Sequence, residues 1–267
     1  MDARILPAGE IVMEERAGGH DKHVKHHHRH PAAVGTPPAE RTCHRTDYGT
    51  IARMIPLRDV IPSRTFPFIN IALIALNAVA FLAELSISDD AFQPFLRDFA
   101  LVPGAFLWTT VLTSMFLHAG WLHFLGNMLY LWIFGDNVED RLGHFRYLVF
   151  YLVCGTVAGL AHVWIHPSSM VPTLGASGAI AGVMGAYFVL YPHSQILTLI
   201  PLFIFYMRVV EVPAIVFLGI WFVLQFLSGA AAAGADAGGV AVWAHVAGFV
   251  AGAVWVLIFR ARRTTWD

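Results

Sequence analysis

The sequence predicts an all-α, polytopic membrane protein that crosses the bilayer six times. Of its 267 residues, 57% are hydrophobic and only 13% are charged, which is too apolar for an ordinary water-soluble domain. The charged residues are also confined, because none occurs in residues 65–83, 99–135, 147–207, 212–235 or 237–259. A membrane span needs roughly 20 apolar residues, so these stretches have room for six spans, with two in the longest stretch.

The six predicted spans take their places from these charge-free stretches. In chain order they cover about residues 66–85, 117–135, 146–164, 173–191, 210–228 and 240–259. A short mixed segment that contains Pro56 and Pro62 leads into the first span. Each span is predicted to be helical because an open sheet cannot satisfy its backbone hydrogen bonds in lipid.

Composition divides the chain into three parts. Residues 1–53 are polar, and the tract His20–His30 within them holds six histidines, which predicts an extension without a core of its own. Such a tract suits binding of a transition metal, but it is at least as typical of an inert, solvated extension. Residues 54–260 are expected to form the membrane domain, and residues 261–267 a short second tail.

The distribution of Lys and Arg predicts the orientation in the membrane. Ten of these residues precede the first span, and six of the other seven follow the second, fourth or sixth span, whereas Arg97 alone lies on the opposite side. Positively charged loops stay in the cytoplasm, so both termini are expected there. Because no organelle-targeting pattern is evident near the N-terminus, a multi-pass protein of a bacterial plasma membrane is expected.

Composition also excludes other classes of function. The net charge is -1, whereas a protein that binds nucleic acid would show a basic face. Cys43 lies in the polar extension and Cys154 in a predicted span, so the two cysteines predict neither a disulfide nor a redox pair. Residues 1–53 lack the uninterrupted apolar run of a secretory signal peptide.

A serine in the fourth span is the first candidate for chemistry. Ser177 lies in the run Gly-Ala-Ser-Gly-Ala-Ile-Ala-Gly of residues 175–182, among side chains too small to cover its hydroxyl. Taken alone, a serine beside the small residues Gly178 and Gly182 is explained by helix packing. Its position favours chemistry, because a helix start near Thr173 would direct backbone N–H groups and a positive dipole end toward it.

The sixth span carries an ionisable side chain, His245. Such a residue is costly in a membrane helix and usually faces the protein interior, either as a functional group or in a helix-to-helix hydrogen bond. Ala244, Gly248 and Gly252 recur every four residues along this span. Because small-residue seams allow two helices to approach closely, His245 is predicted to come within hydrogen-bond reach of Ser177.

The second span contributes His118, His123 and Asn127. His123 and Asn127 are four residues apart, so they project from one helix face as two donors that could form an oxyanion hole. His118 is rotated away from that face, and a structural role in the loop is expected for it. An alternative places zinc on His118, His123 and His245, although no His-Glu-x-x-His pattern or carboxylate accompanies them.

The candidate residues are expected at one depth in the membrane. With the second, fourth and sixth spans all running inward, Ser177 and His245 lie about five residues from the outer end, or roughly 7 Å, and His123 is similarly shallow. A nucleophile, a base and two donors at one level predict a single site in a cavity open to the outside.

Taken together, the motifs resemble those of the rhomboid intramembrane serine proteases. The resemblance covers about residues 54–260. It rests on five motifs: Met-Ile-Pro-Leu-Arg-Asp from Met54, His-x4-His-x3-Asn ending at Asn127, Gly-Asp-Asn-Val-Glu-Asp from Gly135 after the second span, Gly-x-Ser-Gly at Ser177, and Ala-His-x2-Gly-x3-Gly from Ala244.

This resemblance implies a six-transmembrane-helix rhomboid-like bundle and a serine endopeptidase that uses no metal and no small-molecule cofactor. It implies that Ser177 is the nucleophile and His245 the general base, while His123, Asn127 and the backbone N–H of Ser177 hold the oxyanion. The implied partners are the lipid bilayer and single-span membrane proteins, which are cut near the outer ends of their helices.

Two departures from the family pattern are visible. The first external loop has Phe95-Leu96-Arg97 in place of the Trp-Arg pair that some members carry, so the family's loop conformation does not transfer. Ala181 stands one turn after Ser177, where several members have an aromatic ring against the catalytic histidine. Another group must therefore orient His245.

Two rival functions come from other classes. A catalytically silent rhomboid-like protein that binds membrane helices would lack the serine or the histidine, and both are present. A small transporter is compatible with six spans, but it would show an internal repeat or ionisable residues at the bilayer midplane.

Overall fold

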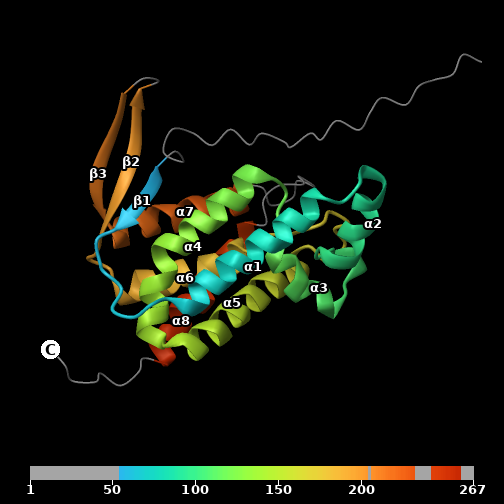
Figure 1. The fold of residues 1–267 in the computed structure, drawn as a ribbon, viewed down its shortest axis with the longest axis horizontal. Helices are drawn as coiled ribbons and strands as arrows, with labels where there is room; N and C mark the ends of the chain where they lie inside the picture. The colour runs from blue at the N-terminus through green and yellow to red at the C-terminus, as the bar shows by residue number, and fades with distance from the viewer. Residues whose placement is uncertain (1–53, 204–205, 232–241, 260–267) are drawn as a thin grey trace, which may run out of the picture. The chain divides into compact units, whose positions relative to one another are not determined.

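The described part of the chain is a bundle of helices with a small sheet at one end (Figure 1). The computed structural model describes residues 54–203, 206–231 and 242–259, and the expected tails, 1–53 and 261–267, lie outside this part. The helices are α1 (Phe68–Leu85), α2 (Asp89–Phe99), η2 (Pro103–Ala105), α3 (Trp108–Thr113), η3 (Ser114–Phe116), α4 (Trp121–Leu142), α5 (His144–Ile165), α6 (Ser177–Leu190), α7 (Ala214–Ala231) and α8 (Val242–Ile258). The strands are β1 (Ile55–Asp59), β2 (Gln195–Phe203) and β3 (Tyr206–Pro213).

A helix occupies each of the six predicted spans. Three of these helices, α1, α5 and α7, are long and apolar enough to cross a membrane. The helices α6 and α8 are also apolar but shorter. The remaining helix, α4, continues past its predicted end at residue 135 to Leu142 and carries charged residues in its last two turns.

The predicted starts of the second, fourth and fifth spans are each wrong by four residues, because local structure delays the helix. Gly120 precedes α4 with a φ of 154°, a conformation that favours glycine. Thr173 pairs with Leu101 in a short β-bridge before α6 begins. In the fifth predicted span, α7 begins only after the strand Tyr206–Pro213.

The protein is mostly helical, as predicted, but it is not all-α, because the described chain also contains a three-stranded antiparallel sheet of order β1-β2-β3. One row across the sheet joins Pro56, Thr198 and Val210. Pro56, Thr198 and Ile196 are buried, so this face packs on the molecule. Residues 195–213 are rich in β-branched residues, which favour strands. The segment is also apolar and adjoins two predicted spans, so its composition does not distinguish it from them.

The central helix of the bundle is α6. Its residues 179–187 are all buried, and it packs against α4, α5, α7 and α8. A Cβ added at Gly248 of α8 would overlap the carbonyl oxygen of Gly178, and one added at Gly252 would overlap that of Gly182. The two predicted small-residue seams are therefore confirmed, and they face each other across α6 and α8.

Carboxylates of α4 hold the start of α1. Glu139 accepts the backbone N–H groups of Ile69 at 3.0 Å and Asn70 at 2.7 Å, so an anion lies at the positive end of the α1 dipole. Asp140 accepts two more backbone N–H groups, at 3.1 and 3.0 Å, from the segment that leads into α1. The motif of residues 135–140, which was expected to follow the second span, thus lies within α4 and anchors another helix.

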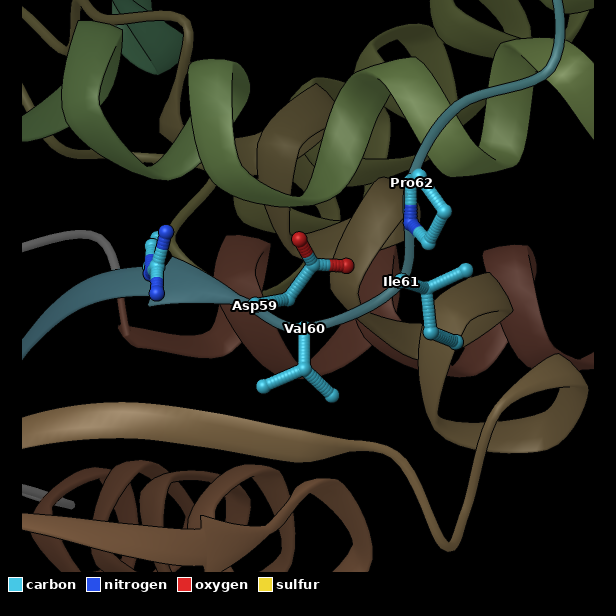
Figure 2. Close-up of a pocket in the computed structure, with 5 residues that line it drawn as sticks. Asp59, Val60, Ile61 and Pro62 are labelled. Carbon is cyan, nitrogen blue, oxygen red and sulfur yellow. The ribbon is translucent and has the colours of Figure 1, made fainter.

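Asp59 joins β1 to two helices. Its carboxylate accepts hydrogen bonds from Asn137 of α4 and Tyr187 of α6, both at 2.7 Å. Figure 2 shows this carboxylate pointing toward α4, beside a hollow of about 280 Å³ lined by residues 58–62. Burial raises the pKa of Asp59 from 3.8 to about 6, against the hydrogen bond from Tyr187 and with the help of the nearby charge of Asp136.

Candidate active site

Ser177 is the first residue of α6, closer to the helix start than the sequence predicted. The segment before it is fixed, because Thr173 and Leu101 exchange backbone hydrogen bonds at 2.8 and 3.0 Å. The N–H of Gly175 also donates to the carbonyl oxygen of Ser114 at 2.8 Å. The first N–H groups of a helix lack partners within it, so Ser177 brings both a hydroxyl and an N–H to the positive end of α6.

His245, the fourth residue of α8, lies against Ser177. Its Nε2 is 2.7 Å from Ser177 Oγ, a hydrogen-bond distance, as predicted from the two small-residue seams. The histidine is buried, with an exposed fraction of 8%. When Nε2 is unprotonated, the Ser177 hydroxyl donates to it, and this is the arrangement in which a base activates a serine nucleophile.

A residue that the sequence analysis did not select makes the second polar contact of His245. Oε1 of Gln225, on α7, lies 3.0 Å from His245 Nδ1. The ring of Trp221, one turn earlier on α7, lies 6.1 Å from the imidazole ring, measured between centroids. A signal was present, because Gln225 is the one amide side chain in the apolar stretch Ala214–Ala231, and polar groups in membrane helices usually face the protein interior.

His123 enters the site from α4, beside Gly175. Its Nδ1 accepts the N–H of Ala119 at 3.4 Å, which leaves Nε2 as the nitrogen that can donate. A Cβ built on Gly175 would lie 2.8 Å from His123 Nε2 and 3.6 Å from Ser177 Oγ. His123 therefore packs closely against the backbone just before Ser177, and a glycine with a φ of 132° at residue 175 permits this approach.

Asn127 lies one turn beyond His123 on the same face of α4. Its exposed fraction is 8%, yet within the described residues its Nδ2 has no hydrogen-bond partner. Leaving a buried donor unpaired costs roughly 1–3 kcal/mol. A donor of this kind suits an oxygen that becomes negatively charged during a reaction.

His118 lies in the loop before α4. Its backbone N–H donates to both carboxylate oxygens of Glu84, at 3.1 and 3.0 Å, and its ring centroid lies 5.3 Å from that of His123. The contact with Glu84 supports the structural role expected for His118. Across residues 54–203, 206–231 and 242–259, no three His, Cys, Asp or Glu side chains are grouped to hold a metal ion, so nothing there supports the zinc alternative.

These contacts define a class of protein: a helical membrane protein in which a serine and a histidine from two closely packed helices meet in a polar site. A family model described as the Rhomboid domain matches residues 105–262, more than half of the chain. The chain therefore belongs to the rhomboid family, as its motifs predicted.

Individual relatives match shorter stretches. Rhomboid protein 1, mitochondrial, from Saccharomyces cerevisiae is 34% identical over 92 residues, which are 33% of this chain and 27% of the yeast protein. Rhomboid protease GluP from Bacillus subtilis is 40% identical over 79 residues, 30% of this chain and 15% of that protein. Putative rhomboid protease YdcA from the same bacterium is 35% identical over 80 residues, 30% of this chain and 40% of that protein. The chain thus covers well under two thirds of the length of each.

Proposed function

We propose that this protein is an intramembrane serine endopeptidase that cuts single-span membrane proteins near the outer ends of their helices. The 2.7 Å separation of Ser177 Oγ and His245 Nε2 carries this proposal. Membership of the rhomboid family, with relatives that are named proteases, supports the same class of reaction. A membrane-helix substrate suits a site at the N-terminal ends of α4, α6 and α8, because such a partner lies in the same bilayer.

In the proposed reaction His245 acts first as a base and then as an acid. Ser177 Oγ attacks the scissile carbonyl carbon while its proton passes to His245 Nε2. The tetrahedral intermediate collapses, the C–N bond breaks, and Nε2 returns the proton to the leaving amine. Water then attacks the acyl-enzyme with help from the same nitrogen, which frees the carboxyl product and restores the Ser177 hydroxyl.

Three donors are proposed to stabilise the negative oxygen of the tetrahedral intermediate. They are His123 Nε2, Asn127 Nδ2 and the backbone N–H of Ser177. The unpaired amide of Asn127 and the closeness of His123 to Gly175, two residues before Ser177, support this role. A preorganised donor of this kind typically contributes about 10²-fold to 10³-fold to the rate.

The membrane arrangement is part of the proposal. All six helices α1, α4, α5, α6, α7 and α8 would cross the bilayer of a bacterial plasma membrane, with both termini in the cytoplasm. The Lys and Arg distribution supports this orientation. Reporters fused after Arg53 and after Arg263 should then read cytoplasmic, and one inserted near Ser168 should read external. The reversed pattern would contradict the proposed topology.

The proposed activity is tested by incubating the purified full chain, in detergent and in liposomes, with a panel of labelled single-span proteins. The wild-type chain should release two fragments from at least one of them, whereas Ser177→Ala should release none. Stable binding of these proteins by the wild type without any cleavage would instead identify a catalytically silent protein that binds membrane helices.

A further inference from the structure

We infer that Gln225 is the positioning residue for His245, setting which imidazole nitrogen carries the proton and where the ring points. This inference rests on the proposed function, because it gives Gln225 a part in the same proton transfer. Its basis is that the imidazole contacts a polar atom at each nitrogen. Ser177 Oγ lies 2.7 Å from Nε2, and Gln225 Oε1 lies 3.0 Å from Nδ1.

The two contacts require one tautomer. A neutral imidazole carries its proton on one nitrogen, and His245 can accept the Ser177 proton only if that nitrogen is Nδ1. The Gln225 carbonyl oxygen is an acceptor, so it stabilises the form in which Nδ1–H donates to it. In the opposite tautomer, Nε2–H would point at the serine hydroxyl, and Nδ1 would lie unprotonated against another acceptor.

Within the described residues, Gln225 is the hydrogen-bond partner of His245 Nδ1. Ala181, one turn after Ser177, has only a methyl group where an aromatic ring could press on the imidazole. On α7, Trp221 lies one turn before Gln225, and its ring is tilted by 39° to that of His245 at a centroid distance of 6.1 Å. Both side chains that orient the imidazole from this direction therefore come from α7.

Gln225 differs chemically from the carboxylate that orients the histidine in a serine–histidine–aspartate triad. Its amide oxygen fixes the tautomer and the ring direction, but it carries no full charge to stabilise the imidazolium that forms during attack. A residue that acts only through orientation should affect kcat and leave substrate binding unchanged. The acceptor atom, and not the volume of the side chain, should be what matters.

Two substitutions separate the acceptor from the volume. Gln225→Met keeps the length of the side chain and removes the acceptor, so kcat should fall about 10-fold to 100-fold, the range expected when a buried donor loses its partner, with KM unchanged. Gln225→Glu keeps an acceptor oxygen and should retain kcat within a few-fold of the wild type. Val223→Met, at a position of α7 that is 53% exposed, controls for a new methionine on this helix and should have no effect.

A second readout does not depend on cleavage. In protein labelled with ¹⁵N-histidine, the signals of His245 are assigned by their absence in His245→Ala. The wild type and Gln225→Glu should show a protonated Nδ1, and Gln225→Met should shift toward a mixture of tautomers. Unchanged signals and unchanged kcat in Gln225→Met would overturn the role of Gln225. If Gln225→Met shows the expected shift but the wild type cleaves nothing, the protease function alone would be overturned.

Discussion

At the scale of single residues, Asn127 is the side chain whose proposed oxyanion role is most open to a kinetic test. Its amide nitrogen is buried and has no hydrogen-bond partner among the described residues. If it binds charge that appears only in the transition state, Asn127→Ala should lower kcat by up to roughly 10²-fold to 10³-fold with little change in KM. Steady-state kinetics on a cleaved single-span substrate measure both constants.

Comparison with His123 sharpens this test. The two donors project from one face of α4 and can partly substitute for each other, so each single variant is expected to be milder than the double variant. A rise in KM with kcat unchanged in Asn127→Ala would show that Asn127 binds the substrate and would contradict its role in stabilising the oxyanion.

Asp59 should make stability depend on pH. Burial raises its pKa in the folded protein to about 6 from 3.8, so the folded state binds more protons than the unfolded state between these values. The contribution of Asp59 is therefore fully present below about pH 4 and is lost as the pH rises through about 6. The unfolding temperature of Asp59→Asn minus that of the wild type should therefore be larger at pH 7 than at pH 4.5. Equal differences at the two pH values, in thermal unfolding followed by fluorescence, would contradict this.

Single residues were predictable where a polar side chain stands among small or apolar neighbours. This contrast picked out Ser177, His245, His123 and Asn127. Gln225 also stands in an apolar helix, and its amide indicates a face turned toward the protein interior, but the sequence does not tell which side chain it meets there. The contact depends on how α7 packs on α8, which spacing along the chain does not contain.

At the scale of elements, the glycine seam between α6 and α8 sets the distance between serine and histidine. A Cβ at Gly248 would overlap the carbonyl oxygen of Gly178, so Gly248→Ala should push the helices apart and cost about 1–3 kcal/mol of stability. Thermal unfolding should shift downward, and cleavage should be lost. Gly126→Ala on α4 is the matched control, since a Cβ there meets nothing within 4 Å. Equal unfolding temperatures for the two variants would contradict the role of the seam.

Most elements were predictable from charge-free stretches, but their ends were not. The start of α4 depends on the φ value of Gly120, and the start of α6 on a β-bridge between Thr173 and the distant residue Leu101. The start of α7 depends on where strand β3 ends. The pairing of β1 with β2 was not predictable for a related reason, because the two strands are separated by more than 130 residues. An apolar segment beside a predicted span gives no sign of such pairing.

At the scale of the whole molecule, the site is assembled from helix ends. His123, Ser177 and His245 are the third, first and fourth residues of α4, α6 and α8, so the three helices begin at a common level. The sequence predicted a shared level, although it placed Ser177 deeper within its helix. The common level follows from packing α6 in the centre of the bundle, with glycines that let α8 approach it.

Covalent modification of the serine tests the central claim most directly. The purified chain is treated with a fluorophosphonate, which reacts with activated serines, and the modified residue is mapped by mass spectrometry of proteolytic fragments. The wild type should carry the adduct on Ser177, and His245→Ala should leave Ser177 unmodified. Absence of the adduct from wild-type Ser177, or its formation at an equal rate in His245→Ala, would contradict activation of Ser177 by His245.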